Sequence, residues 1–207
     1  MTIGPYDLPP LIAILRGITA PEIDGIADAL FEAGFRAAEV PLNSPDPLAS
    51  IARLADRMAG RMLVGAGTVL TPEAVTSAHE AGARLIVSPN CDAAVIRRAR
   101  DLGTVSLPGV MTPTEAFLAL KAGASGLKLY PADVLGISGF KALSAVLPLL
   151  TPVYAVGGID VSRLAGWRSA GAAGVGIGTR LYRPGDTPSV VSARAQGLVA
   201  AWTAAVE

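Results

Sequence analysis

Lys128 is the residue whose type and neighbours most clearly suggest chemistry. The chain has three lysines against fourteen arginines, and Lys128 lies between Leu127 and Leu129 in an apolar run. Because side chains alternate along a strand, Lys128 is predicted to point inward, opposite to both leucines. Burial lowers the pKa of a lysine, and a neutral amine can attack a carbonyl carbon to form a Schiff base. The alternative is a structural lysine paired with a carboxylate.

Glu39 gives a matching signal. It is the one acidic residue, of seventeen, that falls inside a predicted strand. The alternation in that strand directs Ala38 and Val40 outward and Glu39 inward, toward the interior that Lys128 is predicted to share. A carboxylate beside a Schiff-base lysine could move the protons that cleavage of a carbon–carbon bond needs. A plain Lys–Glu ion pair is the alternative, although buried pairs seldom add much stability.

Two turns with glycine could bind a phosphate group. Gly157 and Gly158 follow the seventh predicted strand, and Gly178 and Thr179 end the eighth. Backbone N–H groups in such turns, and at helix N-termini, bind anions. Arg16, at the end of the first predicted strand, could pair with a phosphate or a carboxylate, or form a structural ion pair.

The elements that must position these side chains are strands and helices in alternation. Glycine recurs where a helix should end, mostly every 20 to 26 residues, and a short apolar run follows each time. Capping boxes at Thr19 and Thr112 predict helix starts. A Ser or Thr before proline predicts three more, at Ser44, Thr71 and Thr187. The predicted strands are 11–15, 36–41, 62–66, 84–88, 104–108, 126–130, 152–156 and 174–178.

Eight strand–helix units predict an α/β fold, a (β/α)₈ TIM barrel, with residues 1–207 forming a single domain. A last helix over about 188–206 is expected to close the ring. An open doubly wound sheet is the alternative, but no G-x-G-x-x-G follows the first strand, so its dinucleotide-binding form is disfavoured. In such a barrel the functional groups lie at the C-terminal ends of the strands.

The composition excludes several classes of partner. The chain is 51% apolar and 16% charged, with a formal net charge of zero, so neither nucleic acid nor a membrane surface is expected to bind. No apolar stretch approaches the roughly 20 residues of a membrane-spanning helix, and no signal peptide is expected at the N-terminus. The single cysteine, Cys91, excludes an internal disulfide and fits a cytoplasmic protein.

Metal and thiol chemistry are not expected either. His79 is the one histidine and has no partner at the spacing of a metal site. Cys91 likewise has no histidine partner, and no G-x-S-x-G motif is present. No metal and no cofactor are therefore predicted.

These residues, in this order, resemble the 2-keto-3-deoxy-6-phosphogluconate and -galactonate aldolases, a class I barrel family. The likeness runs through nearly the whole chain. Its motifs are LIAILRG (11–17), AAEVPLNSP (37–45), VGAGTVLTPE (64–73), LIVSPN (85–90), GLKLYPA (126–132), AVGGI (155–159) and GIGTRLYRPG (176–185).

The resemblance implies that Lys128 forms a Schiff base with the C2 carbonyl of the substrate and that Glu39 moves the protons. It places Thr68 and Pro89 at the pyruvate end, with Arg16 nearby, and the phosphate on the two glycine turns. Cleavage between C3 and C4 would give pyruvate and D-glyceraldehyde 3-phosphate. Members of this family are typically homotrimers, and a homotrimer is expected here.

Two positions indicate the galactonate branch of that family. The gluconate branch typically has arginine four residues after the glutamate and threonine before the glycine pair, where this chain has Asn43 and Val156. Loss of a hydroxyl donor near C4 could relax or reverse the preference at that stereocentre. Tyr130 and Thr179 also replace a common phenylalanine and serine. The galactonate substrate is therefore expected, with the 6-phosphogluconate epimer as the alternative.

Two other functions fit parts of the pattern. A phosphosugar isomerase or epimerase could use Glu39 as base and Lys128 as an electrostatic stabiliser, without a covalent intermediate. A noncatalytic barrel that binds a phosphorylated metabolite would leave the costly burial of Lys128 without a purpose.

Overall fold

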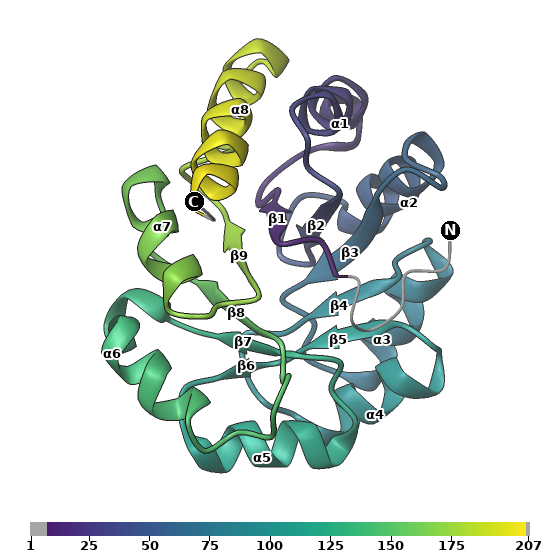
Figure 1. Ribbon diagram of the computed structural model, residues 1–207. Helices are drawn as coiled ribbons and strands as arrows, with labels where there is room; N and C mark the ends of the chain where they lie inside the picture. The colour runs from purple at the N-terminus through teal and green to yellow at the C-terminus, as the bar shows by residue number, and fades with distance from the viewer. Residues whose placement is uncertain (1–7, 206–207) are drawn as a thin grey trace.

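The computed structural model describes residues 8–205, which form a barrel of parallel strands surrounded by helices (Figure 1). The strands are β1 (Leu11–Ile14), β2 (Ala37–Pro41), β3 (Leu63–Gly67), β4 (Leu85–Val87), β5 (Val105–Leu107), β6 (Gly109–Val110), β7 (Leu127–Leu129), β8 (Val153–Val156) and β9 (Gly174–Ile177). The helices are α1 (Ile23–Glu32), preceded by a 3₁₀ turn (Ala20–Glu22), α2 (Pro47–Arg57), α3 (Pro72–Glu80), α4 (Ala93–Asp101), α5 (Pro113–Ala122), α6 (Ala132–Ser144), α7 (Val161–Ser169) and α8 (Pro188–Ala204).

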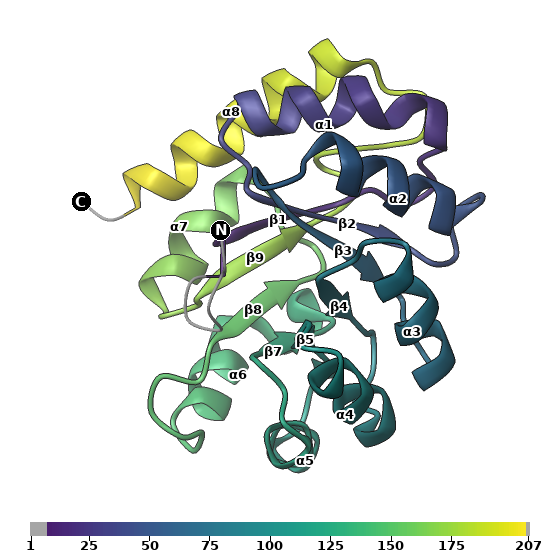
Figure 2. The same cartoon turned by 90° about the vertical axis from the view of Figure 1, so that its right-hand side faces the viewer.

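The arrangement of these elements is that of the predicted barrel. The strand pairs of the described residues are parallel, in the order β5-β4-β3-β2-β1-β9-β8-β7-β6. The helices follow one another around the strands, and α8 packs against α1 to close the ring (Figures 1 and 2). The (β/α)₈ barrel is therefore confirmed.

The fifth strand differs from the prediction. It was expected as one run over 104–108, but Pro108 divides it into β5 and β6, so the described residues hold nine strands. Proline has no N–H to donate to a neighbouring strand. As a result β5 pairs with β4, β6 pairs with β7, and the N–H of Lys128 donates to the carbonyl of Pro108 at 2.9 Å.

Four of the five predicted helix starts are confirmed. The hydroxyls of Thr71 and Thr112 accept hydrogen bonds from the N–H groups of Ala74 and Glu115. The capping box at Thr19 is formed and opens the 3₁₀ turn before α1, and Thr187 directly precedes α8.

The start predicted at Ser44 is wrong. Helix α2 begins at Pro47, after Asp46 in a left-handed conformation with φ 39°. The hydroxyl of Ser44 instead accepts a hydrogen bond from the N–H of Gly17 at 2.9 Å. This contact ties the loop after β2 to the loop after β1, so Ser44 holds two loops together and does not cap a helix.

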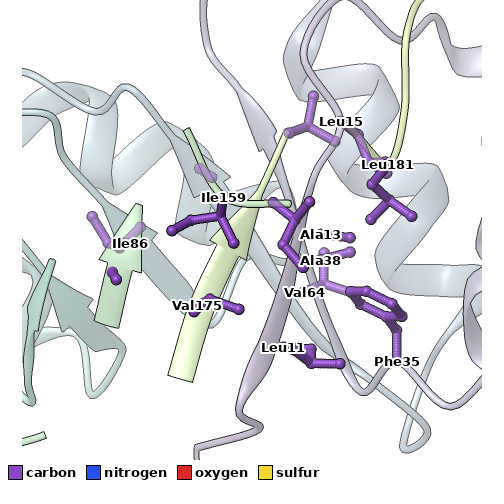
Figure 3. Packing of buried hydrophobic residues seen from close by; sticks show 14 of the residues in the cluster. Leu11, Ala13, Leu15, Phe35, Ala38, Val64, Ile86, Ile159, Val175 and Leu181 are labelled. Atoms are coloured by element: carbon purple, nitrogen blue, oxygen red, sulfur yellow. The ribbon is translucent and has the colours of Figure 1, made fainter. Parts of the chain in front are cut away.

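The core has two layers, one on each face of the barrel wall. The outer layer fills the space between strands and helices; Figure 3 shows Ala38 and Val64 of this layer beside Phe35, and Val175 on strand β9. The inner layer fills the barrel beneath Glu39 and Lys128. It consists of Ile12, Ala37, Leu63, Leu85, Val87, Leu107 and Tyr154. The side chains of Glu39 and Lys128 therefore lie against an apolar layer, which makes their charged forms energetically costly.

Two expectations extend beyond the described part of the chain. The absence of a signal peptide concerns residues 1–7 in part, and the last helix was expected to reach residue 206. These positions lie outside the described residues, and α8 ends at Ala204. Within residues 8–205, none of the helices has the length and apolar character needed to cross a bilayer.

Candidate active site

A cavity of about 360 Å³ lies at the C-terminal ends of the strands. Side chains from strands far apart in the sequence line it, as expected for the functional end of a barrel. Every predicted site residue except Asn43 is among the lining residues. These are Ile14, Arg16, Glu39, Thr68, Pro89, Lys128, Tyr130, Val156, Gly157, Gly158, Ile159, Gly176, Gly178, Thr179 and Arg180.

Lys128 enters the cavity from the middle of β7. Its neighbours Leu127 and Leu129 belong to the outer core layer, so the predicted alternation is confirmed. The residue is only 7% exposed, and its Nζ lies 4.7 Å from the centre of the Tyr130 ring. Burial lowers the pKa of Lys128, which increases the fraction of neutral, nucleophilic amine.

Glu39 enters the same cavity from β2 and is 2% exposed. Its carboxylate packs against Gly67 of β3, where a Cβ would overlap it. One carboxylate oxygen, Oε2, has no hydrogen-bond partner within residues 8–205. Burial raises the pKa of Glu39 to about 7, although the charges of Lys128 and Arg16 act in the opposite direction. A carboxyl group with this pKa can both accept and return a proton near neutral pH.

Lys128 and Glu39 share the cavity without forming an ion pair. Among the described residues, none of the nitrogen–oxygen contacts within 4.0 Å joins the two side chains. Each nevertheless influences the pKa of the other through its charge. The alternative of a structural Lys–Glu pair therefore does not describe this site, and both groups face space that a ligand can enter.

Arg16 lies at the rim above this pair. Its guanidinium donates one hydrogen bond to Oδ1 of Asn43 and a longer one, 3.5 Å, to the hydroxyl of Thr68. Its charge acts on the pKa values of both Glu39 and Lys128. Thr68 has a φ of 54°, a left-handed conformation that is uncommon for threonine and is associated with functional sites. Asn43 thus contacts Arg16 and does not line the cavity.

Three further predicted residues complete the apolar part of the wall. Pro89 lies in the loop after β4 and is half-buried, and Val156 ends β8 and is buried. Tyr130 follows β7 and leaves 40% of its surface exposed. Together they border the space above Lys128 and offer few hydrogen-bonding groups there.

The two predicted phosphate turns lie in the wall of the cavity beyond Val156. Gly157 and Gly158 have φ values of 110° and 66°, which glycine adopts readily. A side chain at Gly158 would also overlap Asp133. Within residues 8–205, the N–H groups of these two glycines and of Gly178 and Thr179 donate no hydrogen bond. Such free N–H groups suit an anionic ligand.

Known proteins support an assignment to one family. A family model described as "KDPG and KHG aldolase" matches residues 7–188. The chain belongs to the KDPG and KHG aldolase family. The resemblance inferred from the sequence motifs is thereby confirmed.

Individual members of this aldolase family agree closely with the chain. A protein of Rhizobium meliloti (strain 1021), "Probable 2-dehydro-3-deoxy-6-phosphogalactonate aldolase", is 49% identical over 94% of this chain and 92% of its own length. The "2-dehydro-3-deoxy-6-phosphogalactonate aldolase" of Escherichia coli (strain K12) is 47% identical over 96% of this chain and 97% of its own length. A solved structure, "Native KDPGal structure", superposes with a TM-score of 0.94, at 47% identity, over 95% of this chain and 96% of that chain.

Four residues that line the cavity of this aldolase were not predicted from the sequence. They are Ile14, Ile159, Gly176 and Arg180. Ile14 and Gly176 lie on strands β1 and β9, and their alternation could have indicated the inward face. Arg180 follows Thr179 directly, so its proximity to a predicted phosphate turn was the available signal.

The candidates for metal or thiol chemistry lie apart from the cavity of the aldolase. Within residues 8–205, His, Cys, Asp and Glu side chains form no cluster of three or more that could hold a metal ion. His79 lies in the last turn of α3, beside Arg84. The thiol of Cys91 contacts the carbonyl of Glu115 at 3.3 Å, and burial raises its pKa, which disfavours the reactive thiolate.

Proposed function

We propose that the chain is a class I aldolase that cleaves 2-dehydro-3-deoxy-6-phosphogalactonate to pyruvate and D-glyceraldehyde 3-phosphate. One observation carries the proposal: a buried Lys128 amine with a lowered pKa shares a cavity with an unpaired Glu39 carboxylate. The names of the two most similar relatives reported above supply the substrate.

The first step is attack of the neutral Lys128 amine on the C2 carbonyl carbon of the substrate. The resulting carbinolamine loses water and becomes a protonated imine, which withdraws electrons from the adjacent carbon. Glu39 is the group in the cavity that can exchange the required protons, because its pKa lies near 7.

The second step breaks the bond between C3 and C4. Glu39 removes the proton of the C4 hydroxyl, the C4 oxygen becomes an aldehyde, and the bonding electrons pass through C3 to the imine nitrogen. This leaves an enamine on Lys128. D-Glyceraldehyde 3-phosphate leaves, and Glu39 delivers its proton to C3 of the enamine. Addition of one water, which equals the water lost when the imine formed, then releases pyruvate and restores the free amine, so no oxidant or reductant is consumed.

The remaining side chains hold the two ends of the substrate. In this proposal Arg16 and Thr68 bind the carboxylate, and Asn43 keeps the Arg16 guanidinium in place through its hydrogen bond. Pro89 and Tyr130 shield the Schiff base from water. The free N–H groups of the Gly157–Gly158 and Gly178–Thr179 turns bind the phosphate at the other end.

The proposed preference for one epimer at C4 of the substrate rests on Val156. Its side chain lines the cavity and is buried, so it offers an apolar surface where a hydroxyl donor would favour the other epimer. We infer a preference for the galactonate substrate, with 2-dehydro-3-deoxy-6-phosphogluconate as the competing one.

We further infer a homotrimer in the cytoplasm. Support for the trimer comes from the family and from apolar side chains left exposed on neighbouring helices, among them Phe117, Leu118 and Val134. One cysteine in the whole chain fits a reducing compartment. Light scattering on the purified protein tests the trimer, and a monomeric mass across the working concentration range contradicts it.

Borohydride reduction in the presence of pyruvate tests the mechanism. We expect one reduced pyruvate adduct on intact protein, located by peptide mass spectrometry at Lys128. The Lys128→Ala variant should remain folded, since within residues 8–205 the Lys128 side chain forms no hydrogen bond or ion pair whose partner would be left unsatisfied, but it should give no adduct and no cleavage. Lys141, which is exposed on α6, provides the control: Lys141→Ala should keep both.

The possible outcomes separate the candidate functions. An adduct at Lys128 together with cleavage supports the aldolase. Turnover of a phosphosugar without any adduct supports the isomerase or epimerase, and binding with neither adduct nor turnover supports the noncatalytic barrel.

A further inference from the structure

Arg180 is a cation in the cavity that the mechanism above does not use. It follows Thr179 in the turn after β9 and lines the cavity. The side chain is exposed, and within residues 8–205 its guanidinium takes part in no hydrogen bond or ion pair. A free guanidinium at a site that binds an anionic substrate is available to that substrate.

The cavity separates its cations into two groups. Arg16 lies close enough to the catalytic pair to influence the pKa values of both Glu39 and Lys128. Arg180 lies in the turn after β9, where it borders this cavity and also a second one lined by Val161, Ser162 and Arg194. It is bonded to Thr179, so it belongs to the end of the cavity where the free N–H groups lie.

The backbone of the turn after β9 is fixed by hydrogen bonds, whereas the Arg180 side chain forms none within residues 8–205. The carbonyl of Gly178 accepts hydrogen bonds from the N–H groups of Leu181 and Tyr182 at 2.8 and 3.0 Å. The guanidinium of Arg183 donates to the carbonyl of Thr179 at 3.1 Å. Both carbonyls are thus engaged, which keeps acceptor groups from repelling an anion and leaves N–H donors and Arg180 to meet it.

We propose that Arg180 is a specificity residue that recognises the terminal phosphate of the substrate. Neutral N–H groups provide hydrogen bonds but no net charge to balance a phosphate dianion, and a guanidinium supplies both charge and paired donors. This inference rests on the proposed function and adds a charged contact to the phosphate end. It predicts that Arg180 matters only when the substrate carries a phosphate.

The test compares two aldehydes in the synthetic direction. Pyruvate is added to D-glyceraldehyde 3-phosphate or to unphosphorylated D-glyceraldehyde by wild type, Arg180→Ala and Arg180→Lys. We expect Arg180→Ala to lower kcat/KM for the phosphorylated aldehyde by roughly 10- to 100-fold, as for loss of a charge-assisted hydrogen bond. In Arg180→Ala, kcat/KM for D-glyceraldehyde should change less than about twofold. Arg180→Lys should recover part of the activity toward the phosphorylated aldehyde, because lysine keeps the positive charge.

Arg163 provides a matched control. It is an exposed arginine in the first turn of α7, on the same rim, and it does not line the cavity. Arg163→Ala removes the same charge, so an equal loss in this variant would attribute the effect to overall charge and overturn the proposal. Equal losses for both aldehydes in Arg180→Ala, or no loss, would overturn it as well.

Failure of this inference can be distinguished from failure of the aldolase assignment. Borohydride trapping of pyruvate on Lys128 should be unchanged in Arg180→Ala. If wild type gives neither adduct nor turnover, the aldolase proposal fails, and calorimetric binding of inorganic phosphate then decides the role of Arg180. Weaker phosphate binding in Arg180→Ala than in Arg163→Ala supports phosphate recognition by Arg180, and equal binding in the two variants contradicts it.

Discussion

The carboxylate of Glu39 fills the space that a side chain at Gly67 would occupy. The substitution Gly67→Ala should therefore displace this carboxylate and lower kcat by about 100-fold, the lower range for loss of a general acid–base. Overpacking between β2 and β3 should also reduce the free energy of unfolding by about 1–3 kcal/mol. Steady-state kinetics and urea unfolding measure the two effects.

Gly197 is the control for this substitution. It lies in α8, and a Cβ there meets nothing within 4 Å. Gly197→Ala should leave kcat unchanged and raise the free energy of unfolding by about 0.5–1 kcal/mol, as in an ordinary helix. Full activity in Gly67→Ala would show that the contact with Glu39 is not needed.

The activity should depend on the ionisation of Glu39. Because its pKa is about 7, the base form required for cleavage increases as the pH rises through neutrality. We expect kcat/KM to rise through an apparent pKa near 7 in the free enzyme. A profile that is flat between pH 5 and about 8 would contradict this assignment.

The same group should make the fold less stable at higher pH. The pKa of Glu39 is raised from 4.5 in the unfolded chain to about 7 in the folded one, so the folded state holds the proton more tightly. Its contribution is fully present below pH 4.5 and is lost as the pH rises to 7, about 3 kcal/mol in all. Glu39→Gln should abolish this loss. Urea unfolding of both proteins at pH 4.5 and 8 measures the difference.

Most of the catalytic site follows from two periodicities in the sequence. The alternation of strands β2 and β7 is enough to direct Glu39 and Lys128 inward, and the strand–helix repeat is enough to predict a barrel. Pro108 is different, because a proline at the end of an apolar run predicts a strand end and does not reveal that pairing resumes after it.

Other features could not be predicted from the sequence, because they depend on contacts between loops that are distant in the chain. Ser44 precedes a proline and so predicts a helix start, but its hydroxyl is engaged by Gly17 of another loop. Substrate binding by Asn43 stays a prediction, and its contact with Arg16, which joins the loops after β2 and β1, was not predicted. Arg180 is one of fourteen arginines, and only the turn after β9 distinguishes it.

Val156 should control the choice between C4 epimers. Val156→Thr replaces a buried methyl with a hydroxyl of nearly equal size at the cavity wall. We expect the ratio of kcat/KM values for the galactonate over the gluconate substrate to fall by about 10-fold, as for gain of one hydrogen bond to the second epimer. Coupled assays with both epimers measure this ratio. Val156→Ala, which adds no donor, should leave the preference in place, and an unchanged ratio in Val156→Thr would exclude the role.

Ser50 offers a test of stability away from the site. Its side chain in α2 is fully buried, and the Oγ has no hydrogen-bond partner within residues 8–205. Ser50→Ala removes this unsatisfied group, so the free energy of unfolding should rise by about 1 kcal/mol without a change in kinetics. A loss of stability in urea unfolding would mean that the hydroxyl has a partner in solution.

The division of the fifth strand gives Lys128 an unusual position in the sheet. The N–H groups of Lys128 and Tyr130 donate to the carbonyls of Pro108 and Val110, which pairs β7 with the short strand β6 next to the break between β5 and β6. Short strands on either side make this junction the place where amide protons should exchange with solvent before those of β1 to β3. An opening there would hydrate Lys128 and remove the burial that lowers its pKa, so less of the amine would be neutral and nucleophilic. Heating that populates this opening should therefore lower kcat/KM reversibly while the rest of the barrel is still folded.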